Sequence, residues 1–179
     1  MKRILSLLLC MILITGMQVT PAFAALEWPS NVSVEAEGAV LMDARSGAVI
    51  YGKNLHAVYY PASITKILTA LIVIEHCNLD DVVTFSHDAI YSVEQGSSSA
   101  GMEVGDQMTV RDCLYAMLLK SANEVANALA EHTAGSIQNF AVLMNAKARE
   151  LGCQESHFNN PSGLNDPQHY TSAYDMALI

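Results

Sequence analysis

Short apolar runs alternate with polar, turn-rich segments along this chain, and the pattern predicts its elements. Residues 39–42 and 48–51 are apolar and are separated by the turn formers Asp-Ala-Arg-Ser-Gly at 43–47, which predicts an antiparallel hairpin. Pro61 then opens a helix that is apolar over much of its circumference, so we expect that helix to be central and buried. From 78 to 106 the sequence turns polar, which favours loops or short irregular pieces.

Helical periodicity dominates the second half of the chain. Thr109 with Asp112 three residues later indicates a helix N-cap with an acid in the first turn, and apolar residues at helical spacing carry that helix to about Lys120. Further helices are predicted over about 124–133 and over 136–151, with Gly152 as a C-terminal stop. The last nine residues resemble the start of another helix, and no third strand is evident to complete a sheet with the hairpin.

Residues 1–24 have the organisation of a secretory signal peptide. A basic start (Met-Lys-Arg) is followed by an apolar run over 4–14 that only Ser6 interrupts, and the small residues Ala22 and Ala24 flank a cleavage point. The apolar run is shorter than the roughly 20 residues that span a bilayer. We therefore expect an exported protein whose residues 25–179 form a single domain.

Composition and charge narrow the classes of partner. Without the first 24 residues, 7 Lys and Arg stand against 18 Asp and Glu, a formal charge of -11 that argues against nucleic acid. Neither the histidines nor the cysteines have metal-ligand spacing, so no metal is implied. The odd set of Cys77, Cys113 and Cys153 is expected to serve as small buried hydrophobic residues.

The strongest chemical signal is Ser63-Ile64-Thr65-Lys66, where the first central helix is expected to begin. Residues three apart share a helix face, so the Lys66 amine can take the proton of the Ser63 hydroxyl and make it a nucleophile. The helix N-terminus adds a backbone N–H and partial positive charge for a developing oxyanion. Alone, the motif is weak, because Ser63 could simply cap the helix while Lys66 lies in solvent.

A second motif changes that balance. Residues 120–123 (Lys-Ser-Ala-Asn) fall in the break between two predicted helices, 58 residues after Ser63. Ser121 and Asn123 are also ordinary turn residues. In combination, however, Ser-x-x-Lys and Ser-x-Asn are two of the three elements that mark penicillin-binding proteins and related β-lactamases.

Further matches follow in order along the chain: 43–47 with 61–63, 96–98 leading into 103–106, and 157–164. With these, the sequence resembles the low-molecular-mass penicillin-binding proteins that act as D-alanyl-D-alanine carboxypeptidases, from about Ala39 to Ile179. The resemblance implies a mixed α/β (α+β) chain of β-lactamase/transpeptidase-like fold, comprising the N-terminal hairpin of the sheet and the helical subdomain. The C-terminal strands of that fold would be missing.

By the same resemblance, Ser63 is the acylated nucleophile, Lys66 the proton acceptor and Ser121 the proton relay to the leaving D-alanine. Asn123 would contact a substrate amide and Lys66. The implied substrate is the peptidoglycan stem pentapeptide, β-lactams are implied inhibitors, and no cofactor is needed. The implied location is the extracytoplasmic face of the membrane, the periplasm or the cell wall, with membrane association only through a missing C-terminal region.

One departure from the family leaves alternatives open. The third element, Lys-Thr-Gly on a strand, does not occur in these 179 residues, although in the family it supplies an oxyanion N–H and holds the substrate carboxylate. We therefore expect an N-terminal portion of a longer protein. A serine β-lactamase is one alternative, with Glu155 four residues before Asn159 as its acid. A truncated, inactive remnant is the other: we expect this 179-residue chain by itself to be inactive, and the full-length protein to be the active carboxypeptidase. Residues 160–164 (Asn-Pro-Ser-Gly-Leu) favour the carboxypeptidase pattern.

Overall fold

The structure is a computed structural model that describes residues 32–179, so the predicted signal peptide lies outside the described part. Its hairpin pairs β1 (Ala39–Met42) with β2 (Val49–Lys53) in antiparallel register, Leu41 opposite Tyr51. Asp43 closes the turn by accepting hydrogen bonds from the backbone N–H and the hydroxyl of Ser46. The predicted hairpin is thus confirmed, and within residues 32–179 no further strand pairs with it.

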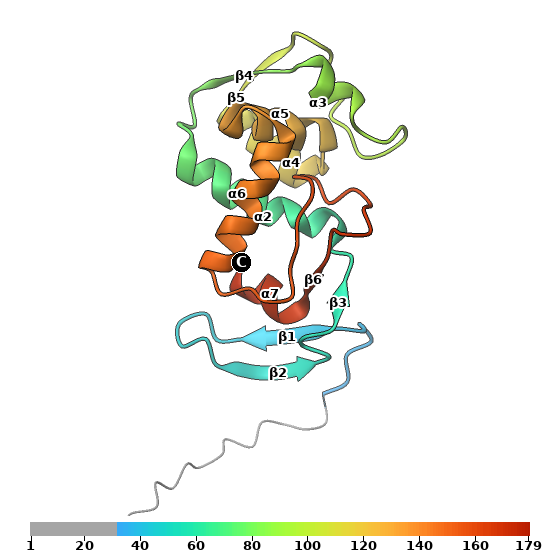
Figure 1. Cartoon of the computed structure of the whole chain (residues 1–179), viewed down its shortest axis with the longest axis vertical. Helices are drawn as coiled ribbons and strands as arrows, with labels where there is room; N and C mark the ends of the chain where they lie inside the picture. Colours follow the sequence, from blue (N-terminus) through green and yellow to red (C-terminus); the bar gives the residue numbers. More distant parts are fainter. Residues whose placement is uncertain (1–31) are drawn as a thin grey trace, which may run out of the picture. The chain divides into compact units, whose positions relative to one another are not determined.

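Two shorter ladders join segments that lie far apart in sequence. β3 (Val58–Tyr59) pairs with β6 (Thr171–Ser172), and β4 (Val82–Thr84) pairs with β5 (Gln107–Thr109). The first ladder brings the chain end, through α7 (Ala173–Leu178), against β1, as Figure 1 shows. It also brings the segment after residue 157 beside the segment that precedes Ser63.

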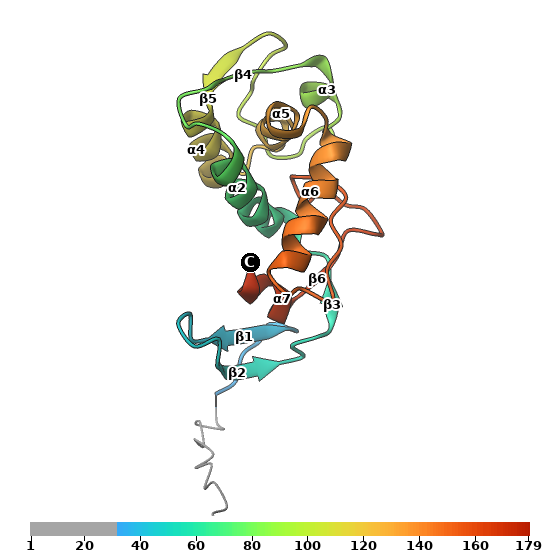
Figure 2. The ribbon, with the colours of Figure 1, turned by 60° about the vertical axis from the view of Figure 1, so that its left-hand side comes forward.

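The helices pack around α5 (Asn123–Ala134), which contacts α2 (Thr65–His76), α3 (His87–Tyr91), α4 (Val110–Lys120) and α6 (Ile137–Glu150). Figure 2 shows α2, α4 and α6 around it from a second side. Buried apolar side chains fill the space between these helices, among them Leu68, Ile72, Val83, Met117, Leu129, Phe140 and Phe158. Within residues 32–179, no helix has the length and apolar character that crossing a bilayer requires.

Local signals predicted the helix ends well. Thr109 caps α4, with its hydroxyl accepting from the Asp112 backbone N–H at 3.1 Å, and the helix ends at Lys120. After α6, Gly152 takes the left-handed conformation (φ 93°) expected of a C-terminal stop. The final predicted helix forms as α7, and its start is capped by the Ser172 hydroxyl.

Two expectations need correction. The helix after Pro61 is not buried all round: Leu68 and Ile72 are inaccessible, but Ile67 and Ile74 are 49% and 57% exposed because the neighbouring helices cover only one side of α2. The polar region 78–106 is not all loop either, since it contains β4 and α3. The local sequence does not predict β4, because this strand has only three residues and is stabilised by pairing with β5 further along the chain.

The cysteines meet the expectation only in part. Cys113 and Cys153 are buried, whereas Cys77 is partly exposed, and its Sγ lies 3.3 Å from the Thr133 hydroxyl. No two cysteines among residues 32–179 form a disulfide.

Candidate active site

Ser63 lies in a 3-10 turn, η1 (Ala62–Ile64), that leads directly into α2. Ala62 has a left-handed backbone (φ 50°), a strained conformation of the kind that concentrates at functional sites. The Ser63 side chain makes no helix cap, since Pro61 and Ile64 occupy the cap positions. The alternative that Ser63 is only a cap is therefore wrong, and the residue is exposed at the surface.

Lys66 follows one turn later and is 2% exposed, so the alternative of a solvated lysine is also wrong. Its Nζ donates to three acceptors: Ser63 Oγ at 3.2 Å, Asn123 Oδ1 at 2.8 Å and the Ser162 carbonyl at 2.6 Å. Burial lowers the pKa of the Lys66 amine to about 8, although the negative charge of Glu124 opposes the shift. The amine can therefore lose its proton close to neutral pH.

Ser121 approaches Ser63 from the other side. Its Oγ donates to Ser63 Oγ at 2.9 Å, across 58 residues of sequence. Ser121 ends α4 in a left-handed conformation (φ 59°), which a residue with a side chain adopts at a cost in free energy. This turn also delivers Asn123 to Lys66, so the structure brings all four residues singled out in the sequence to one place.

The segment 159–164 completes the surroundings of Lys66. The Ser-x-x-Lys and Ser-x-Asn motifs had not predicted a contact between this segment and Lys66. Asn160 Oδ1 accepts the backbone N–H groups of Ser162, Gly163 and Leu164, which shapes the loop so that the Ser162 carbonyl faces Lys66. The Thr69 hydroxyl anchors the same loop by donating to the Pro161 carbonyl at 2.7 Å. In the sequence, this segment was marked by its turn-rich Asn-Pro-Ser-Gly and by the family match over 157–164, neither of which indicated a contact with Lys66.

His169 ties this segment to the turn that carries Ser63. The imidazole is 2% exposed, and its Nδ1 accepts from the Asn159 backbone N–H at 3.1 Å. Nε2 therefore carries the hydrogen and donates to the Thr65 hydroxyl at 2.9 Å. Burial lowers the pKa of His169 to about 4, so the ring stays neutral. A lone histidine offered no sequence signal for this role.

Glu155, the acid suggested for a β-lactamase, has other partners. Its carboxylate lies 3.3 Å from His56 Nδ1 and 3.4 Å from the Ser172 hydroxyl. These residues belong to the region of the short β3–β6 ladder. The carboxylate makes no hydrogen bond to Ser63, Lys66 or Ser121 among the described contacts, so nothing in this geometry supports it as a base for deacylation.

Comparisons with known proteins identify the family of this chain. A family model described as D-alanyl-D-alanine carboxypeptidase, peptidase S11, matches residues 25–179. D-alanyl-D-alanine carboxypeptidase DacF of Bacillus subtilis is 38% identical over 187 residues, which cover 100% of this chain and 47% of that protein. The chain thus spans about half the length of the curated relatives it matches.

Solved structures give the same result. D-alanyl-D-alanine carboxypeptidase DacD from Francisella tularensis matches with a TM-score of 0.78 and 35% identity, over 84% of this chain and 37% of that one. Penicillin binding protein 6B from Escherichia coli matches with a TM-score of 0.79 and 32% identity, over 86% and 51%. The penicillin-binding, transpeptidase-like fold expected from the sequence is confirmed.

Proposed function

This chain belongs to the D-alanyl-D-alanine carboxypeptidase family, and we propose that the protein is a serine-type enzyme that removes the terminal D-alanine of peptidoglycan stem pentapeptides. One observation carries the proposal: the Lys66 amine and the Ser121 hydroxyl both hydrogen-bond to the Ser63 oxygen. An exposed nucleophile between a buried amine and a second hydroxyl is the arrangement that acyl transfer requires.

Acylation begins with a neutral Lys66. The two hydrogens of the neutral amine go to Asn123 Oδ1 and the Ser162 carbonyl, so the lone pair faces the Ser63 hydroxyl. Lys66 takes the hydroxyl proton while Ser63 Oγ bonds to the carbonyl carbon of the penultimate D-alanine. The N-terminal end of α2 places partial positive charge beside the oxyanion that forms.

Ser121 completes the first half of the reaction. It passes a proton to the nitrogen of the terminal D-alanine, is reprotonated from the Lys66 ammonium, and the C–N bond breaks to leave an ester on Ser63. Asn123 contacts the amide of the bound peptide. Water then adds to the ester, Ser63 leaves with a proton, and the shortened peptide departs as a carboxylate. None of these steps needs a cofactor.

Substrate and location follow from the same proposal. The stem peptide of peptidoglycan lies outside the cytoplasmic membrane, so the enzyme acts on the extracytoplasmic side, in keeping with the predicted signal peptide. β-Lactams resemble the D-alanyl-D-alanine end and acylate the same serine. The name penicillin binding protein for a structural relative supports this part of the proposal.

Intact-mass spectrometry after incubation with benzylpenicillin tests the nucleophile. We expect one penicilloyl adduct on the protein and none on Ser63→Ala. Ser46→Ala, which changes an exposed serine in the β1–β2 turn, should keep the adduct. An adduct that persists in Ser63→Ala would overturn the assignment. Acylation without release of D-alanine from a diacetyl-Lys-D-Ala-D-Ala peptide would refute the carboxypeptidase activity.

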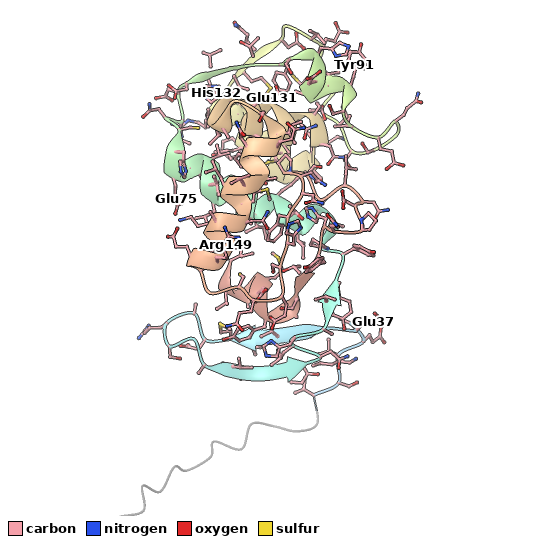
Figure 3. The ribbon with its side chains drawn as sticks, in the orientation of Figure 1. Glu37, Glu75, Tyr91, Glu131, His132 and Arg149 are labelled. Atoms are coloured by element: carbon pink, nitrogen blue, oxygen red, sulfur yellow. The ribbon has the colours of Figure 1, made fainter. Side chains whose placement is uncertain are left out.

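A lysine pair tests the base. Lys66→Arg keeps the positive charge but cannot deprotonate, so acylation should fall by about 100-fold to 10,000-fold. Lys147→Arg is the control, because Lys147 pairs with Glu75 at 2.8 Å and Glu150 at 3.0 Å, and these contacts raise the pKa of its amine. Figure 3 labels Glu75 at the end of α2. A wild-type rate in Lys66→Arg would remove Lys66 from the mechanism.

A further inference from the structure

Glu124 stands directly after Asn123, in the first turn of α5, and its side chain is 2% exposed. A carboxylate buried to this degree is costly unless hydrogen bonds or opposite charge compensate it. None of the steps described above uses it. Its hydrogen bonds and its charge point to two separate tasks.

The first oxygen holds a loop. Glu124 Oε1 accepts from the Ser99 hydroxyl at 2.8 Å, the Ala100 backbone N–H at 2.6 Å and the Gly101 backbone N–H at 3.2 Å. The neighbouring Ser98 carbonyl accepts from the Asn123 backbone N–H at 2.9 Å. Residues 98–101 are therefore fastened at four points to the start of α5, beside the residue that binds Lys66.

The second oxygen is left without a hydrogen bond. Among the described residues, Glu124 Oε2 is buried and has no partner. The negative charge of Glu124 acts on the Lys66 amine and partly offsets the effect of burial on its pKa. Two other ionisable groups on neighbouring elements bring no buried charge: His169 is neutral, and Lys120 at the end of α4 is exposed to solvent.

We infer that Glu124 is a positioning residue of this site: it fastens loop 98–101 to the Ser-x-Asn turn, and its negative charge favours the protonated form of the Lys66 amine in the free protein. The inference rests on the proposed function, because it assigns Glu124 a part in setting the base of that mechanism. The two tasks separate by variant. Glu124→Gln removes the charge and keeps an acceptor for the loop, while Glu124→Asp keeps the charge and shortens the reach to the loop.

Direct titration of Lys66 by carbon-13 NMR, with lysine labelled at Cε and the signal assigned through Lys66→Arg, measures the first task. Without the negative charge, Lys66 should lose its proton more easily, so the titration midpoint of Lys66 should be lower by about one pH unit in Glu124→Gln. Glu124→Asp should stay within a few tenths of the wild type. The control is Glu131→Gln on the same helix, labelled in Figure 3, whose carboxylate accepts from the Ser86 hydroxyl at 2.6 Å. It should leave Lys66 unchanged.

Hydrogen exchange of the Ala100 and Gly101 amides measures the second task. Glu124→Asp should lose protection at least tenfold there, and Glu124→Gln should retain most of it. An unshifted Lys66 midpoint in folded Glu124→Gln overturns the inference. If Glu124→Gln does not fold, a midpoint in Glu124→Asp that falls by a full unit overturns it instead.

These measurements also separate this inference from the proposed function. If benzylpenicillin acylates the wild type and the Lys66 midpoint does not move in Glu124→Gln, only the role of Glu124 fails. If nothing is acylated but the midpoint falls as expected, the role of Glu124 in setting the Lys66 proton stands and the proposed mechanism fails.

Discussion

Gly163 is the position where a single added methyl group should disable the site. Its backbone is left-handed (φ 82°), and a Cβ there would lie 1.8 Å from the carbonyl oxygen of Ala62, one residue before Ser63. No side-chain rotation relieves an overlap with backbone. In Gly163→Ala, either the loop that presents Ser162 to Lys66 or the turn that carries Ser63 has to move.

Gly135 is a matched control that isolates the overlap. It has nearly the same backbone (φ 78°), but an added Cβ meets nothing within 4 Å. Both alanine variants incur the left-handed penalty of about 1–2 kcal/mol. Only Gly163→Ala adds an overpacking cost, about 2 kcal/mol or more. For a domain of this size, that difference lowers Tm by about 4–8 °C beyond the change in Gly135→Ala.

Thermal unfolding followed by circular dichroism gives the two Tm values, and benzylpenicillin acylation is measured well below both. Because a displacement of about 1 Å in a catalytic group can lower a rate about 100-fold, folded Gly163→Ala should acylate at least tenfold more slowly than Gly135→Ala. Equal stability losses in the two variants would refute the steric argument. Wild-type acylation by Gly163→Ala would show that the approach to Ala62 does not position Ser63.

Three further predictions follow from the buried ionisable groups. Burial lowers the pKa of Lys66 to about 8, and the base must be neutral. In stopped-flow measurements, the acylation rate should therefore rise with pH and be half-maximal near pH 8. A rate that stays constant from about pH 6 to 9 would contradict this. Burial lowers the pKa of His169 from 6.5 to about 4, so the unfolded chain binds a proton at this residue more readily than the folded chain does. The free energy of unfolding should therefore decrease as the pH falls from about 6.5 to 4. Urea unfolding should show a smaller decrease in His169→Gln. Burial raises the pKa of the Cys113 and Cys153 thiols to about 12, so iodoacetamide near pH 8 should modify the partly exposed Cys77 first. If peptide mapping showed all three cysteines modified equally, the result would be inconsistent with the fold.

The helical half of the fold could be predicted because its signals are local. A cap such as Thr109 and a stop such as Gly152 act on backbone groups within one turn, so the sequence carries the information at the place where it is used. The β-ladders are different. Val82–Thr84 and Val58–Tyr59 become strands only by pairing with segments far along the chain, and short runs of this kind have no distinctive period.

The burial of α2 shows the limit of composition. Its apolar residues correctly predicted a central helix, but which side is covered depends on where other elements pack. Leu68 is enclosed and Ile67 is half exposed, although both are apolar and adjacent.

The sequence by itself determined the partners that lie one helical turn apart. Ser63 and Lys66 share a face because of their spacing, and the family resemblance added Ser121 and Asn123. Only the tertiary structure decided the state of Lys66, because the charge of Glu124 comes from about 58 residues away and the Ser162 carbonyl from about 96 residues away, and both lie beside the buried amine. A pKa depends on everything packed around a group, whereas spacing along one helix depends on the backbone alone.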